Sequence, residues 1–277
     1  LTNKILKINN LKVIPNNNSR LRLVDNITLD LNKGKTTCIV GESGSGKSLT
    51  ALSVMQLLSS QLNMSGNIFF EETNLLNLSK DEIRKKRGKD IAMIFQEPMT
   101  SLNPVLTIGY QIQEAIQVHQ KLSKHDLSRR VQELLNIVGI PSSRSESYPD
   151  ELSGGQRQRV MIAMAISSSP KLLIADEPTT ALDVTVQAQI LNLLNNLKLK
   201  FQMTMLFITH DFGVVEDIAD DVAVMYQGKI VEKGSVENVL NRPKHPYTKA
   251  LLDCVPDSQG KKALKPIDYN ILKKLMG

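Results

Sequence analysis

The sequence contains few cysteines and no long apolar run. Cys38 and Cys254 form neither a CxxC pair nor a disulfide framework, as expected for a protein of a reducing compartment. VMIAMAI (160–166) is among the longest apolar runs, well short of the roughly 18 residues that predict a membrane span. The first ten residues, LTNKILKINN, lack the apolar core of a secretory signal. These absences predict a soluble, cytosolic chain.

The composition is that of an ordinary globular protein. The chain has 277 residues, of which 41% are hydrophobic and 22% charged, enough for one large domain or a domain with a sub-domain. Internal repeats and low-complexity segments are absent from the sequence. The net charge of +6 suits nucleic acid, an anionic membrane surface or a phosphate ligand, and does not choose among them.

Short apolar runs alternate with segments of helical period, which favours an α/β domain with a mainly parallel sheet. Buried strands are predicted at TTCIV (36–40), IAMIF (91–95), LLIA (172–175), MLFI (205–208) and VAVMY (222–226), and helices at 47–58, 125–138, 156–167 and 186–200. PNNNS (15–19) is a turn signal between two N-terminal strands. The proline-punctuated interval 97–155 breaks the alternation and is predicted to be an inserted helical subdomain.

The clearest motif is GESGSGKS (41–48), which directly follows a predicted strand and opens a helix. It matches the phosphate-binding loop G-x-x-x-x-G-K-[ST], in which glycines let backbone N–H groups wrap phosphates at a helix start. The predicted nucleotide contacts are Gly41, Glu42, Ser43, Gly44, Ser45, Gly46, Lys47, Ser48 and Leu49. Lys47 would reach the β- and γ-phosphates and act in catalysis, and the Ser48 hydroxyl would hold Mg²⁺. A chance match is the alternative, and the strand–loop–helix context disfavours it.

The second motif, KLLIADEP (171–178), is a buried strand that ends in two carboxylates. Asp176 would lie at the carboxyl edge of the sheet, where ligands of open α/β sheets bind, and would hold Mg²⁺. Glu177 would polarise the attacking water. Taken alone, the motif is better explained as a strand followed by an acidic helix cap. Together with the phosphate loop it indicates a nucleoside triphosphatase that uses ATP and Mg²⁺.

A third motif, LSGGQ (152–156), resembles the signature of ATP-binding cassette (ABC) proteins, and further marks follow in that family's order. The resemblance covers about residues 4–250 and implies that Gln96 is the coupling glutamine and a magnesium ligand. It also implies that Asp183 lies at the dimer seam and that His210 is the catalytic switch histidine. Ser153, Gly154, Gly155 and Gln156 would contact the nucleotide of a partner ATPase subunit, identical or paralogous, docked head to tail. Ser153 itself is predicted to be a helix N-cap.

Three longer segments resemble the ATPase subunits of peptide and nickel importers. They are FQEPMTSLNP (95–104), SYPDELSGGQ (147–156) and RPKHPYTKALL (242–252). The resemblance implies a peripheral subunit at the cytoplasmic face of the membrane that powers uptake of peptides or a related small solute. Its partners would be transmembrane permease subunits and, indirectly, an extracytoplasmic solute-binding protein, with no nucleic acid. The family's cassette would span 1–240, with a C-terminal extension at 241–277.

The chain departs from that branch in two places. Where relatives carry an aromatic residue that stacks on adenine, this chain has Ile14 and Pro15, so apolar contact from Ile14 or Val24 would have to substitute. The sequence also lacks the C-terminal cysteines that hold an iron–sulfur cluster in many members, so no cluster is expected.

Two other functions remain as alternatives. A soluble ABC ATPase acting on nucleic acid or ribosomes would suit the basic charge, but such proteins usually show coiled-coil insertions, zinc cysteines or two cassettes. A simpler phosphate-loop kinase or GTPase would leave LSGGQ unexplained.

Overall fold

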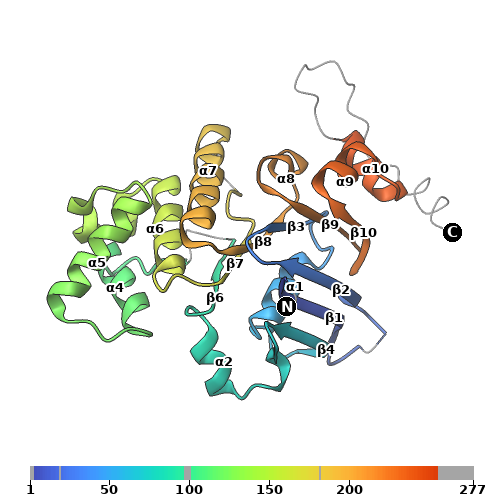
Figure 1. The fold of residues 1–277 in the computed structure, drawn as a ribbon, viewed down its shortest axis with the longest axis horizontal. Helices are drawn as coiled ribbons and strands as arrows, with labels where there is room; N and C mark the ends of the chain where they lie inside the picture. Colours follow the sequence, from blue (N-terminus) through green and yellow to red (C-terminus); the bar gives the residue numbers. More distant parts are fainter. Residues whose placement is uncertain (1–2, 19, 97–100, 181, 255–277) are drawn as a thin grey trace. The chain divides into compact units, whose positions relative to one another are not determined.

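The computed structural model describes residues 3–18, 20–96, 101–180 and 182–254, which form two compact units (Figure 1). The first unit combines Leu1–Leu76 with Phe207–Gly277, and the second is Asn77–Leu206. Strand β8 (Thr204–Thr209) runs across the division between them.

An antiparallel sheet forms the N-terminal part of the first unit, with strands in the order β2-β1-β4-β5 (Figure 1). Its strands are β1 (Lys4–Pro15), β2 (Val24–Asn32), β4 (Leu62–Phe70) and β5 (Thr73–Asn74). Apolar residues alternate along β1, so Leu6 and Ile8 are fully buried on one face of the sheet. The predicted turn after Pro15 is confirmed, because β1 ends there and pairs with β2 in antiparallel register.

The remaining strands of the first unit carry the elements around the phosphate loop. β3 (Thr36–Val40) pairs in parallel with β9 (Asp221–Tyr226), which pairs in antiparallel register with β10 (Lys229–Ser235). All five residues of β3 are buried, which explains its unbroken apolar run. The helices of the unit are α1 (Lys47–Val54), α8 (Phe212–Ile218), α9 (Val236–Asn241) and α10 (Pro246–Asp253).

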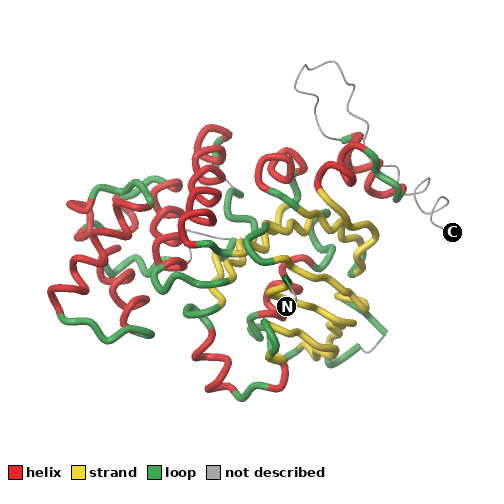
Figure 2. Tube along the Cα trace, viewed as in Figure 1, coloured by secondary structure: helices red, strands yellow, loops and turns green. Residues whose placement is uncertain are grey.

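The second unit joins a parallel strand pair to a group of helices. β6 (Ile91–Ile94) pairs in parallel with β7 (Leu172–Asp176). The helices are α2 (Lys80–Lys86), α4 (Ile108–Gln117), α5 (Lys124–Ile137), α6 (Gly154–Ile166) and α7 (Val184–Phe201). Helices α4, α5 and α6 pack against one another (Figure 2), with short 3₁₀ turns at Ser142–Glu146 and Pro149–Glu151.

The predicted α/β fold class is confirmed, and the five predicted strands agree with the observed ones to within one residue at each end. The helix predicted at 47–58 ends earlier, at Val54, because Gln56 has a φ of +50° that no α-helix accommodates. The limits of the inserted subdomain at 97–155 and of the cassette at 1–240 remain predictions. Most of the predicted extension at 241–277 lies outside the described residues. No helix in the described part of the chain is long and apolar enough to cross a membrane.

Candidate functional site

The phosphate loop connects the end of β3 to the start of α1, as predicted. Gly46 is the N-cap of α1 and has a φ of +105°, and as a glycine it has no side chain to cap the helix start. A Cβ at this position would lie 2.7 Å from Leu23 O and 2.7 Å from Met225 Cε. Glycine is therefore required here both by the backbone conformation and by the close approach of neighbouring atoms. The N–H groups of the first helical turn are left without a side-chain cap, as in an anion site.

The interior of this loop is polar and enclosed. Lys47 is 4% exposed, and its Nζ donates to Gly41 O at 2.7 Å and to Glu42 O at 2.9 Å. The hydroxyl of Ser45 is buried and has no hydrogen-bond partner among the described residues. A buried hydroxyl without a partner is costly unless a ligand or water bonds to it. The buried ammonium, the unsatisfied hydroxyl and the uncapped helix start all fit a bound phosphate group.

In the second unit, the carboxyl ends of two strands bring predicted site residues together. Because β6 and β7 are parallel, with Ile94 opposite Ala175, the residues that follow each strand lie at the same edge. Gln96 Nε2 donates to Glu177 Oε2 at 3.2 Å. The Thr180 hydroxyl donates to the same oxygen at 3.0 Å, a contact that the sequence analysis missed.

Glu177 itself has an unusual backbone conformation. Its φ is +46°, in the left-handed region that non-glycine residues rarely adopt, and Glu177 is only 9% exposed. Such a conformation costs on the order of 1 kcal/mol per residue and persists where the surrounding structure enforces it. Asp176, the last residue of β7, is 5% exposed. The strained backbone and the two donors hold the Glu177 carboxylate in one orientation at the strand end.

The LSGGQ segment forms a capped helix start. Ser153 is the N-cap of α6, and its hydroxyl accepts from the Gln156 N–H at 3.3 Å while Gln156 Oε1 accepts from the Ser153 N–H at 3.0 Å. This reciprocal capping box confirms the predicted cap. Gly155 allows close packing on α7, because a Cβ there would lie 2.6 Å from Val186 Cγ1. Asp183 is the N-cap of α7, since its Oδ1 accepts from the Val186 N–H at 2.9 Å.

The predicted site residues other than His210 thus fall into three local groups. The phosphate loop belongs to the first unit, and the Gln96–Glu177 pair and the start of α6 belong to the second. His210 directly follows β8 and is exposed. The sequence analysis also gave no role to Tyr247, although its hydroxyl contacts Glu42 of the phosphate loop. Its place in the segment HPYT was the available signal.

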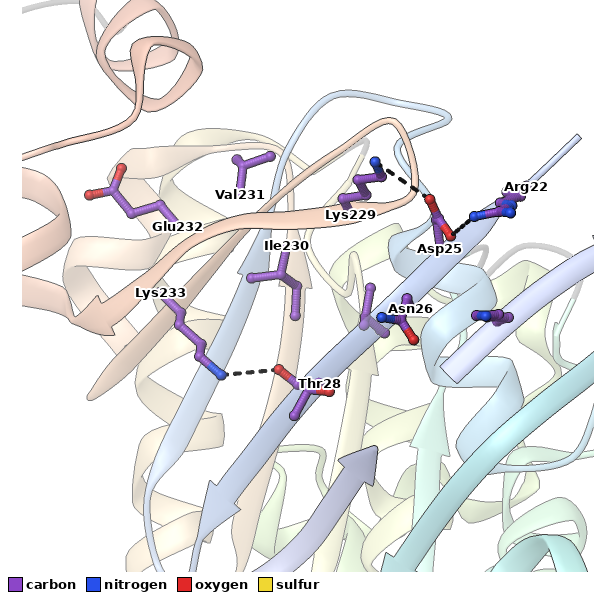
Figure 3. Close-up of a pocket in the computed structure, with 11 residues that line it drawn as sticks. Arg22, Asp25, Asn26, Thr28, Lys229, Ile230, Val231, Glu232 and Lys233 are labelled. Atoms are coloured by element: carbon purple, nitrogen blue, oxygen red, sulfur yellow. Dashed lines mark hydrogen bonds and ion pairs between the residues drawn. The ribbon is translucent and has the colours of Figure 1, made fainter. Parts of the chain in front are cut away.

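A cleft of about 640 Å³ in the first unit contains none of the predicted site residues (Figure 3). Asp25 pairs there with Arg22 at 2.9 Å and with Lys229 at 3.5 Å. Burial raises the pKa of Asp25, but its hydrogen bond and charge pairing with Arg22, aided by Lys229, outweigh this and leave the pKa below its usual value. Lys233 donates to Thr28 O at 3.1 Å. The lining holds four cations, Lys12, Arg22, Lys229 and Lys233, against two carboxylates, Asp25 and Glu232, so the cleft keeps a net positive charge.

A glycine-rich loop with a buried lysine and an oriented strand-end carboxylate define the class of phosphate-loop nucleoside triphosphatases. The sequence profile described as ABC transporter matches residues 24–180. A second profile, described as oligopeptide/dipeptide transporter, C-terminal region, matches residues 231–273. The chain belongs to the ABC transporter family, and it is an ATPase of that family.

Curated relatives support the same family. The peptidoglycan transport ATP-binding protein YejF of Agrobacterium fabrum is 55% identical over 240 residues, which are 85% of this chain and 44% of YejF. The oligopeptide transport ATP-binding protein OppD of Bacillus subtilis is 50% identical, over 89% of this chain and 71% of OppD. The glutathione import ATP-binding protein GsiA of Salmonella choleraesuis is 54% identical, over 84% of this chain and 39% of GsiA. The chain therefore spans less than half the length of YejF and GsiA.

Solved structures share the fold. The ATP-binding cassette MJ0796, a dimer bound to ADP and Pi in a post-hydrolysis state, is 26% identical with a TM-score of 0.74, over 83% of this chain and 98% of that one. The protein cbiO1 of Clostridium perfringens, part of the ABC transporter complex cbiONQ, is 27% identical with a TM-score of 0.75, over 87% and 92% of the two chains.

Proposed function

We propose that this ABC ATPase is the subunit that powers uptake of peptides or a related small solute by an importer. The observation that carries the proposal is the oligopeptide/dipeptide transporter profile at residues 231–273, which follows the ABC transporter profile at residues 24–180 in the same chain. The names of OppD and GsiA, which refer to oligopeptide transport and glutathione import, support the same class of solute.

In the proposed mechanism the phosphate loop holds ATP. Backbone N–H groups of the loop would surround the β- and γ-phosphates. Lys47, which donates to two loop carbonyls in this structure, would turn its ammonium to the phosphate oxygens. This exchange replaces two neutral carbonyl acceptors by anionic phosphate oxygens, which attract the ammonium more strongly.

Hydrolysis needs a water held in line with the γ-phosphate, and phosphoryl transfer to it is mostly positioning and charge stabilisation. Glu177 would orient that water, because its carboxylate is already fixed by Gln96 and Thr180. His210 is the proposed second catalytic residue. Magnesium, when bound, neutralises charge on the phosphate oxygens, and the assignment of Ser48, Gln96 and Asp176 as its ligands rests on the sequence motifs.

The start of α6 would complete the site of a second ATPase chain. Ser153 and Gly154 are exposed, while the hydroxyl of Ser153 accepts from its own helix and keeps a proton to donate. Gly155 and Gln156 continue the same helix start, and Asp183 would lie at the seam between the chains. The dimeric state of MJ0796 supports this arrangement. The permease subunits and the solute-binding protein would be separate chains, with this subunit peripheral at the cytoplasmic face of the membrane.

Adenine would be held without an aromatic platform. Val24 is completely buried beneath the loop, with Cγ2 3.4 Å from where a Cβ on Gly46 would lie, so it offers no surface to a base. Ile14 and Pro15 are half-buried at the end of β1 and offer the apolar contact.

The rival function, a soluble ABC ATPase acting on nucleic acid or ribosomes, predicts different partners. An affinity-tagged chain should be purified from native membranes in mild detergent and its bound subunits identified. The proposal predicts that permease subunits co-purify with the chain and that its ATPase activity is found in the membrane fraction. Recovery of ribosomal proteins or nucleic acid, with none of the chain in membranes, would replace it by the rival.

A further inference from the structure

Tyr247 is the largest fully buried side chain in the described part of the chain, and the proposed mechanism gives it no role. It lies in the first turn of α10, and its ring packs on Tyr226 with centroids 4.2 Å apart. Its hydroxyl accepts from the Glu42 N–H at 3.2 Å and donates to Glu42 Oε2 at 3.1 Å. A tyrosine hydroxyl provides one donor and an acceptor, and both are used here on a single residue of the phosphate loop.

Glu42 is also the residue whose peptide carbonyl organises the loop interior. Its carbonyl oxygen accepts from Lys47 Nζ at 2.9 Å and from the Ser45 N–H at 3.2 Å. The Tyr247 hydroxyl therefore binds the backbone N–H and the carboxylate of Glu42, while the Glu42 carbonyl binds Lys47. Movement of Glu42 would displace the phosphate loop, whose N–H groups are proposed to bind the nucleotide.

The start of α10 is itself fixed to β10, so Tyr247 is supported from a rigid element. Both carboxylate oxygens of Glu232 accept backbone N–H groups, from Lys244 at 2.8 Å and from His245 at 3.0 Å. Burial raises the pKa of Glu232, but its hydrogen bonds outweigh this and leave the pKa below its usual value, so it is ionised at neutral pH. His245 Nδ1 then accepts from the Tyr247 N–H at 3.2 Å as the N-cap of α10.

We propose that Tyr247 is a positioning residue for ATP binding: it holds Glu42 so that the phosphate loop is preorganised for the nucleotide. The C-terminal region, matched by its own family profile, is thereby coupled to the ATP site through one hydroxyl. This inference rests on the binding of ATP at the phosphate loop. Preorganisation raises affinity by reducing what must be ordered on binding, so its loss appears in the affinity rather than in the chemical step.

The test compares Tyr247→Phe with Tyr226→Phe in the full chain. Both variants remove one hydroxyl from the same stacked pair, but the Tyr226 hydroxyl accepts from its neighbour Gln227 at 3.1 Å and makes no hydrogen bond to the phosphate loop among the described residues. Affinity for ATP, KM, kcat and thermal unfolding without nucleotide are measured for each. We expect Tyr247→Phe to weaken ATP affinity and raise KM by about tenfold, with kcat at saturating ATP within about twofold of wild type and Tyr226→Phe close to wild type in all of them.

The outcomes separate the inference from the proposed function. Binding and hydrolysis of ATP by the wild-type chain test the ATPase function on which the inference rests. The ratio of the ATP affinities of the two variants tests the role of Tyr247. Unchanged affinity in Tyr247→Phe, or equal losses in both variants, would overturn the inference while leaving the ATPase intact.

Discussion

Two helix starts in this chain are organised in opposite ways. Helix α1 begins at Gly46, which provides no side-chain cap, beneath a loop whose Lys47 and Ser45 are buried. Helix α6 begins at Ser153, which closes a capping box with Gln156, and both Ser153 and Gly154 are exposed. The start of α1 is enclosed, and no side chain caps its backbone N–H groups, which leaves them for a ligand. The start of α6 is exposed, and the Ser153 side chain already accepts from one of its backbone N–H groups.

This difference indicates which partner each start serves. An uncapped, enclosed helix start is completed by an anion held by its own chain. A capped and exposed start is stable without a ligand, so it is suited to meeting a phosphate that another molecule presents. We infer that the start of α1 binds the chain's own nucleotide, whereas the start of α6 meets the nucleotide held by a second ATPase chain. The predictions below test this division, beginning with the largest expected effect.

Glu177→Gln separates binding from hydrolysis. The amide keeps the shape of the side chain but removes the charge that orients water, so the hydrolysis rate should fall by about 10²- to 10³-fold, in the range of general-base effects. Binding should persist, because the loop around α1 is unchanged. Steady-state phosphate release and ATP titration measure the two quantities, and the variant should accumulate as an ATP-bound dimer in size-exclusion chromatography. Wild-type turnover would remove Glu177 from the mechanism.

Gly46→Ala should damage the enclosed start. The new Cβ would overlap Leu23 O and Met225 Cε, and its φ of +105° is strained for alanine. We expect a loss of about 2–4 kcal/mol in the free energy of unfolding, the sum of backbone strain and overpacking. ATP affinity should fall with it. Urea unfolding with and without ATP measures both losses, and Gly44→Ala is the control for space, since nothing lies within 4 Å of a Cβ there. Equal stability of the two variants would contradict the enclosure of α1.

Ser153→Ala should affect the exposed start differently. Loss of the N-cap should lower stability by about 1 kcal/mol. Hydrolysis should fall because a donor to the partner's phosphate is lost, while the affinity of the isolated chain for ATP stays near wild type. Ser153→Thr keeps the hydroxyl and serves as the matched control. Weaker ATP binding by the alanine variant in dilute, monomeric protein would contradict the claim that the start of α6 takes no part in binding the chain's own ATP.

The smallest effect concerns the base. Aromatic stacking is worth about 1–3 kcal/mol per base in other nucleotide sites, and Ile14 and Pro15 provide only apolar contact. ATP and GTP should therefore differ in affinity by less than about tenfold, as measured by competition for the same site. A preference of a hundredfold would require a base-reading contact that this account does not contain.

Much of the fold and of the site follows from local sequence. The buried strand TTCIV and the glycines of the phosphate loop are set by neighbouring residues, and so is the N-cap at Ser153. These were predicted because hydrophobic period, positive φ and caps act over a few positions.

Contacts between distant segments were not predictable in this way. Tyr247 reaches Glu42 across 205 positions, a separation that no local pattern spans. The early end of α1 depends on Gln56, whose side chain bonds to Leu75 O in the same unit. Such contacts depend on tertiary packing, which overrides local propensity.

The most direct test of this role for the start of α6 mixes two inactive variants. Ser153→Arg retains an intact phosphate loop, and Lys47→Ala retains an intact α6 start, so a mixed dimer contains one composite site with both parts unaltered. If the chain pairs with itself, an equimolar mixture should recover up to about one quarter of wild-type ATPase activity, because half of the dimers are mixed and each has one of two sites. If it pairs with a second ATPase subunit, the equivalent variants of that subunit complete the cross. No recovery at any ratio, with Ser153→Arg alone hydrolysing ATP at the wild-type rate, would contradict the shared site.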